Sequence, residues 1–297
     1  MNKSFTLIEI LVVIVIIGIL STFILVGTNS ITKSANFAKG KAFSNSLRNS
    51  LLINLVSEWK FDGPSDSGIA TTNDVKDSWG INNGIIISGN EPTIEISNCT
   101  SGHCLDFDGV DDRIDVGNHS SLNLTDYITI EYWANIQGQS SNGYCSETVS
   151  RRGCYDVCCN ILYSTIDGHP DIVLASGSSP GYNIWFHAVY TYDSETTFGK
   201  FYRDSRLLNN REISSLYPGY TTYKMGSSCS NLYISNSVYR FNGILDEIKI
   251  YNRVLSSSQI KQNYYVGLNK LFKNNKIVLD EFKHKIIELK SNLSTHE

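Results

Sequence analysis

Charge of either sign is scarce in this sequence, basic residues are not in excess, and no internal repeat is present. Charged residues make up 18% of the chain and the formal net charge is −4 at pH 7, so no basic field favours binding to nucleic acid. The lack of self-similarity at periods of about 20–50 residues argues against a solenoid or propeller. Cysteine is absent before Cys99, and all seven cysteines lie between Cys99 and Cys229. Such clustering predicts a domain that folds in an oxidising compartment.

Tyrosine, by contrast, is abundant. The chain holds 17 Tyr, and aromatic residues reach 11% of its 297 residues. This composition is typical of β-rich extracellular or surface domains rather than of charged helical cytosolic ones. The length suits one or two globular units.

One long apolar run stands near the N-terminus. Residues 5–26 form 22 consecutive positions with a single charge, Glu9. As a helix, this run is long enough to span a bilayer; it is too long for a secretory signal, and no A-x-A-like site follows it. A carboxylate in lipid predicts a partner, although an acid near the end of a span can also reach the headgroups.

The residues around Glu9 favour the first interpretation. The sequence MNKS-FTLIE resembles the leader of type IV prepilins and type II secretion pseudopilins. The resemblance implies cleavage between Ser4 and Phe5, methylation of the new amino terminus at Phe5, and pairing of Glu9 with the amino terminus of a neighbouring subunit during assembly. That family prefers Gly before the cut, so Ser4 puts efficient processing in question. Residues 1–4 are then the leader and residues 5–56 a transmembrane and assembly helix.

The pattern changes near Trp59. Before it, residues 28–56 carry apolar side chains at helical spacing, which predicts an amphipathic helix that packs on its own head domain or in a filament core. After it, short β-type runs alternate with turn residues and predict an antiparallel sandwich. The runs are 57–61, 84–88, 93–96, 104–107, 112–116, 128–135, 159–166, 172–175, 184–192, 199–203, 232–234 and 244–251.

Four phrases sharpen the fold. WKFDG, CLDFDGVDDRIDVGNHSSLNLTDYITIEYWANI, WFHAVYTYD and FNGILDEIKIYNRVLSSSQI occur in this order. They resemble laminin-G-like domains of the concanavalin A type, and the resemblance covers residues 57–266. It implies a jelly roll, a fold that hosts sugar binders, protein binders and enzymes alike.

Catalytic residues are not evident in the sequence. A glycosidase of this fold needs two carboxylates on one strand face, but the candidate inner strand supplies only Glu131. Asp106 and Asp108 have the right spacing, yet they lie where the family has a turn. No Ser-His-Asp or Cys-His context is present, so we expect the protein not to be an enzyme.

Calcium is a possible ligand of the head. Jelly rolls of this type often hold one Ca²⁺ where the first and last strands meet, and Asp62 and Asp246 match those positions by resemblance. Carboxylate oxygens are the ligands that Ca²⁺ prefers. The alternative is that both are ordinary aspartates at strand ends.

The cysteines are partly interpretable. Cys99 and Cys104 close a short loop between two strands, which predicts a disulfide between them. The other five leave the pairing open: Cys145, Cys154, Cys158, Cys159 and Cys229. Zinc bound by Cys154, Cys158 and Cys159 is disfavoured because no C-x₂-C spacing occurs. Residues 137–159 are expected to form a long, stapled loop.

Two further segments are candidates for interaction. Tyr217, Tyr220 and Tyr223 surround a Pro-Gly turn and could present ring faces to a sugar or protein, or simply pack. Residues 267–297 predict two short helices broken at Asn274-Asn275. This tail resembles the SHOCT-type helical hairpin, an interaction element, and packing on the sandwich is the alternative.

Together the patterns predict a mainly β protein with a long N-terminal pilin-type helix, a jelly-roll head and a short C-terminal helical extension. The resemblances imply a minor pilin or pilin-like protein whose lectin-like head binds a glycan or surface protein, as in adhesion. Its other expected partners are pilin subunits, the prepilin peptidase and the membrane. It is expected in the cytoplasmic membrane before assembly and at the cell surface or in a filament afterwards. Two alternatives are a type II secretion pseudopilin that binds secreted protein and an anchored glycoside-active enzyme.

Overall fold

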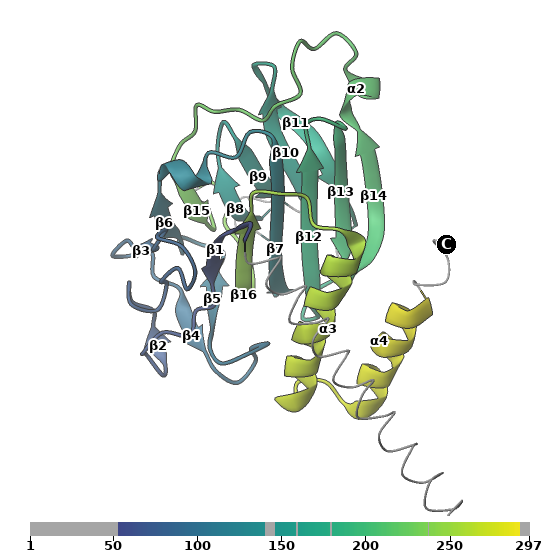
Figure 1. Cartoon of the computed structure of the whole chain (residues 1–297). Coiled ribbons are helices and arrows are strands. Elements are labelled where there is room, and N and C mark those ends of the chain that lie inside the picture. The colour runs from purple at the N-terminus through teal and green to yellow at the C-terminus, as the bar shows by residue number, and fades with distance from the viewer. Residues whose placement is uncertain (1–52, 140–145, 159, 179, 237, 292–297) are drawn as a thin grey trace, which may run out of the picture. The chain divides into compact units, whose positions relative to one another are not determined.

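A computed structural model describes residues 53–139, 146–158, 160–178, 180–236 and 238–291. The chain divides into two compact units, Met1–Ile53 and Asn54–Glu297, and the described residues belong almost wholly to the second. In that unit two antiparallel sheets form a sandwich, and two C-terminal helices follow (Figure 1). The expected jelly-roll-like, mainly β fold is thereby confirmed. The expected helix over residues 5–56 lies outside the described residues except at its end, where Leu55 already begins a strand.

The larger sheet has nine strands. Their order is β14-β13-β12-β7-β16-β5-β4-β2, with β1 paired to β16. The bounds are β1 Leu55–Trp59, β2 Gly68–Ile69, β4 Thr93–Glu95, β5 Cys104–Asp108, β7 Tyr127–Ile136, β12 Trp185–Asp193, β13 Phe198–Arg203, β14 Arg206–Glu212 and β16 Asn242–Tyr251. The first strand and the last strand of the sandwich are therefore direct neighbours, although the sequence separates them widely.

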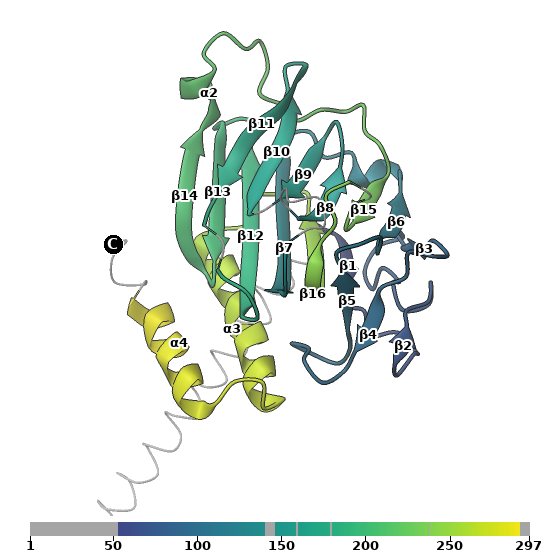
Figure 2. The ribbon, with the colours of Figure 1, turned by 180° about the vertical axis from the view of Figure 1, so that it is seen from behind.

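The smaller sheet has seven strands in the order β11-β10-β9-β8-β15-β6-β3, and Figure 2 shows it from behind. The bounds are β3 Ile85–Ile86, β6 Ile114–Gly117, β8 Glu147–Arg151, β9 Tyr155–Cys158, β10 Ile161–Ile166, β11 His169–Ser176 and β15 Leu232–Ile234. The expectation of one long loop over 137–159 was wrong, because β8 and β9 pair as a hairpin. Their turn closes on Gly153, whose φ of 86° suits glycine.

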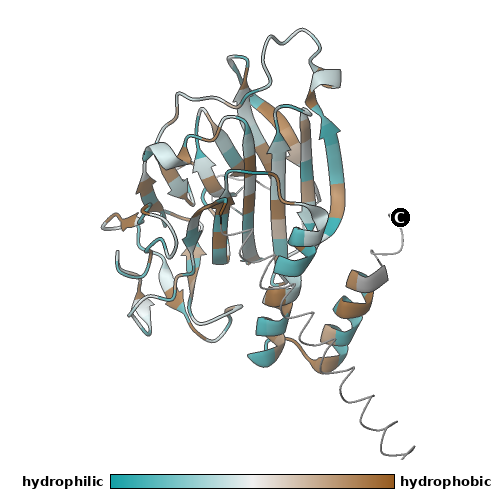
Figure 3. Cartoon of the chain, viewed as in Figure 1, coloured by the Kyte–Doolittle hydropathy of each residue, from teal (hydrophilic) through white to brown (hydrophobic). Residues whose placement is uncertain are grey.

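Successive side chains of a strand point to opposite faces of the sheet, so every second residue packs in the core. In β7, Ile128, Ile130, Tyr132 and Ala134 point into the main core between the sheets. The alternate residues Thr129, Glu131, Trp133 and Asn135 point to the outer face, yet all of them are buried. Figure 3 shows the mixture of apolar and polar bands along these strands. Something must therefore cover the outer face of the larger sheet at β7.

The cover is helix α3, Ser257–Lys273, which is followed by α4, Leu279–Ser291. Ser256 and Gln259 form a capping box that starts α3, so the helix crosses the expected boundary between head and tail at residue 266. Tyr264, Leu268 and Leu271 pack on Trp133 of the sheet. The first tail helix therefore belongs to the head. Its predicted end at Asn274 is confirmed.

Two short helical turns, η1 Ser120–Leu122 and α2 Ile213–Leu216, complete the described elements. Disulfides join Cys99 to Cys104 and Cys154 to Cys229. The first is the pairing that the short loop predicts. Cys158 is also disulfide-bonded, so neither Cys154 nor Cys158 offers a thiolate to zinc.

Candidate functional site

Asp246 of β16 accepts hydrogen bonds from the loop that the Cys99–Cys104 disulfide closes. Asp246 Oδ2 accepts hydrogen bonds from the backbone N–H of Thr100 at 2.9 Å and of Ser101 at 3.2 Å, and from the Thr100 hydroxyl. Asp62, beyond β1, accepts from the N–H of His103 at 2.8 Å. The two aspartates that the sequence singled out for calcium thus contact the same loop.

The same loop region reaches the helices and a second strand. Asn274, at the end of α3, donates to the carbonyl of Thr100 at 3.2 Å, and Lys276 donates to the carbonyl of Ser97. Asn98 Oδ1 accepts a hydrogen bond of 3.0 Å from the indole N–H of Trp185 in β12. Residues 97–104 therefore fasten β12, β16 and the α3–α4 connection to one another.

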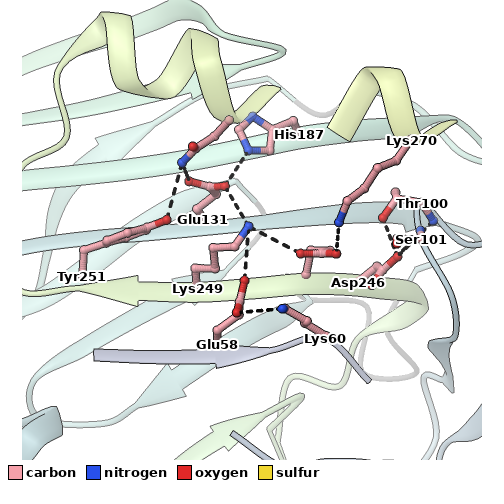
Figure 4. Close-up of polar contacts among 12 residues, drawn as sticks. Glu58, Lys60, Thr100, Ser101, Glu131, His187, Asp246, Lys249, Tyr251 and Lys270 are labelled. Carbon is pink, nitrogen blue, oxygen red and sulfur yellow. Dashed lines mark hydrogen bonds and ion pairs between the residues drawn. The ribbon is translucent and has the colours of Figure 1, made fainter. Parts of the chain in front are cut away.

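A network of buried charges lies between the sheet and α3 (Figure 4). Lys249 Nζ lies 3.5 Å from a carboxylate oxygen of Glu131 and 3.5 Å from one of Glu247. From α3, Lys270 reaches Glu247 at 2.5 Å. A bulge in β16 between Asp246 and Lys249, with Glu247 at a φ of 51°, makes this arrangement possible. The bulge lets Ile248 point into the main core, while Glu247 and Lys249 on either side of it point to the outer face and join the network.

Two effects act in opposite directions on the pKa values of the carboxylates in this network: burial raises them and neighbouring cations lower them. Burial acts to raise the pKa of Glu131, but Lys249 and His187, whose Nε2 lies 3.3 Å away, outweigh it and bring the pKa to about 2. At Asp246, burial and the adjacent Glu247 raise the pKa well above its usual range. Its second oxygen, Oδ1, is buried and has no hydrogen-bond partner. Glu131 is therefore a paired structural carboxylate, and Asp246 is an incompletely satisfied one.

A cavity of about 340 Å³ lies beside this network, where the outer face of the larger sheet meets the two helices. We call it the Trp185 pocket. The residues that line it are Asn98, Trp133, Asn135, Asn183, Ile184, Trp185, Tyr264, Leu268, Leu271, Lys276, Ile277, Glu281 and Lys285. Trp133 stacks on Tyr264 with ring centroids 5.7 Å apart, so the inner wall is aromatic and fixed.

The polar side chains that line the Trp185 pocket include three amides (Asn98, Asn135 and Asn183) and three charged groups (Lys276, Glu281 and Lys285). Asn98 accepts a hydrogen bond from Trp185. Asn135 is only 5% exposed, and its side-chain oxygen Oδ1 is buried without a hydrogen-bond partner. An aromatic wall with a few convergent amides is suited to a sugar, which has an apolar ring face and hydroxyls that donate and accept. The sequence did not reveal this set, because β7–β12 pairing places Asn135 opposite Trp185 across 50 residues.

The three candidate tyrosines, Tyr217, Tyr220 and Tyr223, contact one another, and their arrangement bears on the two interpretations that the sequence left open. Tyr220 stacks on Tyr217 at 5.0 Å between ring centroids and on His169 at 4.8 Å. The hydroxyl of Tyr223 donates to the carbonyl of Tyr217. Because both neighbours cover the ring of Tyr220, its faces are not available to a sugar. The packing interpretation is the better one for Tyr220.

The expectation that Asp106 and Asp108 lie in a turn was wrong, because both belong to strand β5, where burial, helped by Asp108, raises the pKa of Asp106. Glu131, the other carboxylate considered for catalysis, is paired with Lys249. Within the described part of the chain, Asp108, Asp111 and Asp112 are the three acidic groups that come within 4.8 Å of one another. Asp62 and Asp246 are not in that cluster.

Ser4, Phe5 and Glu9 lie outside the described residues, as does Cys145. Among the helices that the structure describes, none has the length and apolar character of a membrane span.

Comparison with known families agrees with this architecture. A family described as "Concanavalin A-like lectin/glucanases superfamily" matches residues 108–261, more than half of the 297 residues. The chain belongs to the concanavalin A-like lectin/glucanase superfamily. A second family, the "Prokaryotic N-terminal methylation motif", matches residues 1–25 of this lectin-like protein. A search of curated proteins found no match.

Solved structures share the fold at low sequence identity. The botulinum neurotoxin serotype D ligand-binding domain in complex with N-acetylneuraminic acid has a TM-score of 0.54 and 12% identity, covering 75% of this chain and 53% of that one. The binding domain of Paraclostridial Mosquitocidal Protein 1 has a TM-score of 0.51 and 16% identity, covering 74% and 53%. The chain spans about half the length of these structures. At such identity the likeness concerns the fold alone.

Proposed function

We propose that this protein is a pilin-like surface protein whose lectin-like head binds carbohydrate in the Trp185 pocket. The observation that carries the proposal is the pocket itself: a Trp-lined cavity in which the buried side-chain oxygen of Asn135, Oδ1, has no hydrogen-bond partner. The methylation motif over residues 1–25 supports delivery as a pilin. Cleavage before Phe5, its methylation and assembly through Glu9 are part of this proposal, as is passage from the cytoplasmic membrane to the cell surface.

Glycan-array binding by the Asn54–Glu297 unit tests the binding role. Asn135→Leu is the sharpest variant, because it removes an amide whose oxygen is unsatisfied in the free protein. We expect it to be as stable as the parent head, since no hydrogen bond of Oδ1 is lost. We also expect it to bind the best array glycan roughly tenfold more weakly, the equivalent of about 1.4 kcal/mol.

Trp185→Ala should abolish binding, and Trp79→Ala is its matched control. Trp79 is 46% exposed and lies outside the pocket, so its loss should leave the array profile unchanged. Binding to no glycan, or equal binding by parent and Asn135→Leu heads, would contradict the assignment. Binding to secreted proteins instead of glycans would favour the pseudopilin alternative.

We also propose a structural calcium ion at Asp246. The support is Asp246 Oδ1, a buried carboxylate oxygen without a hydrogen-bond partner in the described residues. Oδ2 already accepts from three donors of residues 100–101, so Oδ1 is the atom that would face the ion. Asp62, which accepts from the N–H of His103 in the same loop, would supply the second carboxylate. Bound calcium would keep Asp246 ionised and would tighten the disulfide loop, which directly follows Asn98 in the wall of the Trp185 pocket.

A further inference from the structure

A second cavity, of about 260 Å³, lies on the outer face of the smaller sheet. Strands β8, β9, β10 and β11 contribute to it (Figure 2). Tyr155, Val157 and Leu162 point into the main core, so the alternate residues Asp156 and Tyr163 face outwards and line the cavity. It shares no lining residue with the Trp185 pocket. We call it the Glu147 pocket.

Glu147 is the buried acid of this pocket. Only 2% of the residue is exposed. One carboxylate oxygen, Oε1, lies 3.0 Å from Nη2 of Arg152. The other, Oε2, is buried and has no hydrogen-bond partner. The nearest protein donors are already engaged, because the Ser150 hydroxyl donates to Asp156 and the Asn236 amide donates to Ser150. A buried carboxylate oxygen at the wall of a cavity is therefore a position where a ligand can supply the missing donor.

The charges around Glu147 indicate which charge the donor group of a ligand should carry. Asp156 and Asp171 add two more carboxylates, and Arg152 is the one cation among the described lining residues. Arg152 is already engaged, because it pairs with Glu147 and its guanidinium lies 5.1 Å from the ring centroid of Tyr239. The pocket therefore has an excess of acceptors and negative charge, which disfavours anionic sugars and favours a cationic group.

The size of the pocket and its rings restrict the ligand further. A bare divalent ion needs six to eight close oxygen ligands and leaves most of such a cavity empty. Tyr163 lines the cavity and supplies aromatic surface for a sugar ring, and an ammonium group carries three donors for the acids. We propose that the Glu147 pocket binds an amino sugar through its protonated primary amine. The assignment is independent of the Trp185 pocket, which lies on the other sheet.

The pKa of Glu147 agrees with this geometry. Burial and the neighbouring Asp156 raise it to about 7, and Arg152 only partly opposes them. The same burial raises the pKa of Asp156. An ammonium in the pocket favours the ionised form of Glu147 and lowers its pKa. At pH 6, where Glu147 of the empty pocket is mostly protonated, binding therefore releases a proton.

Isothermal titration calorimetry of the full-length protein in detergent tests the proposal. The probes are a β-1,4-linked glucosamine trisaccharide and its fully N-acetylated counterpart, which lacks the charge. We expect the parent to bind the amine form at least tenfold more tightly and to release about one proton at pH 6, measured in two buffers of different ionisation enthalpy. Glu147→Gln should weaken binding at least tenfold and abolish the proton release.

Controls make the result interpretable. Asp280→Asn removes a carboxylate that lies outside the pocket on a side chain that is 96% exposed, and this variant should bind like the parent. Asp171→Asn alters an exposed lining residue, so it should fold even where Glu147→Gln does not, and it should weaken binding several-fold. Equal binding of the two trisaccharides overturns the proposal. So does parent-like binding by both pocket variants, or equally tight binding of Nα-acetyl-lysine amide, which would show a site for protein lysines.

Discussion

Lys249 is the cation that three carboxylates of the head have in common. Its ammonium lies 3.9 Å from Glu58, 3.5 Å from Glu131 and 3.5 Å from Glu247. Glu131 is 1% exposed and the Glu247 side chain 6%, so water cannot replace the lysine as their partner. Removal of one partner from such a group is far more harmful than replacement of the whole group.

Lys249→Met is therefore expected to destabilise the Asn54–Glu297 unit by about 3–5 kcal/mol, the usual effect of leaving a buried charge unpaired. Urea unfolding followed by tryptophan fluorescence measures it. Lys76→Met is the matched control: Lys76 is exposed, and its change should stay within about 0.5 kcal/mol. A loss below about 1 kcal/mol for Lys249→Met would show that the network contributes little.

The low pKa of Glu131 also sets a pH dependence. Its pKa in the folded protein, about 2, lies below the usual 4.5. The stabilisation from this group is therefore complete above about pH 4.5 and is lost as the pH falls towards 2. We expect Glu131→Gln to be less stable at pH 7 and to show a flatter decline in stability between pH 5 and 2. An unchanged acid limb would contradict the assignment.

Individual residues of the site were only partly predictable. Cys99 and Cys104 are five residues apart, and their pairing followed from that local spacing. Asp246 was singled out by resemblance, but its bonds to Thr100 and Ser101 span about 146 positions and needed the fold. For Tyr220 the sequence left packing and ligand binding open, because it does not show that His169 lies on the tyrosine ring. Trp185 and Asn135 were missed because strand pairing, not sequence proximity, joins them.

At the scale of elements, helix α3 and the paired strands β7 and β12 form the Trp185 pocket together. The sequence indicates the start of α3, because Ser256 and Gln259 have the spacing of a capping box. The β8–β9 hairpin is less apparent, because its five buried positions in β8 include Glu147, Ser150 and Arg151. Polar residues buried in partnerships do not produce the apolar alternation by which strands are recognised.

Calcium removal tests the loop as an element. If calcium binds at Asp246 at 100-fold its Kd, it stabilises the head by about 2.7 kcal/mol, and EDTA should lower Tm accordingly. Asp246→Asn should lose the response to EDTA. It should also be at least as stable as the calcium-free parent, since it removes a carboxylate whose pKa burial raises. The exposed Asp280→Asn variant should keep the response. An EDTA-insensitive parent would refute the calcium proposal.

At the scale of the whole molecule, the two sheets present two different chemistries. The pocket on the outer face of the larger sheet offers tryptophan, amides, two lysines and one glutamate, and the pocket on the smaller sheet offers carboxylates, tyrosines and one arginine. A lectin-like domain that carries both is suited to a glycan of mixed composition. Binding at either pocket has a biological use only if the head is displayed, and the N-terminal motif over residues 1–25 is what supports display.

The intact mass and N-terminal sequence of the mature protein, isolated from its native cells, test that display most directly. A chain processed as a pilin begins at Phe5, carries one methyl group on its amino terminus and lacks residues 1–4. Co-purification with other pilin subunits should accompany it. A mature protein that retains Met1 or Asn2, or begins beyond the apolar run at residue 26, would contradict the account.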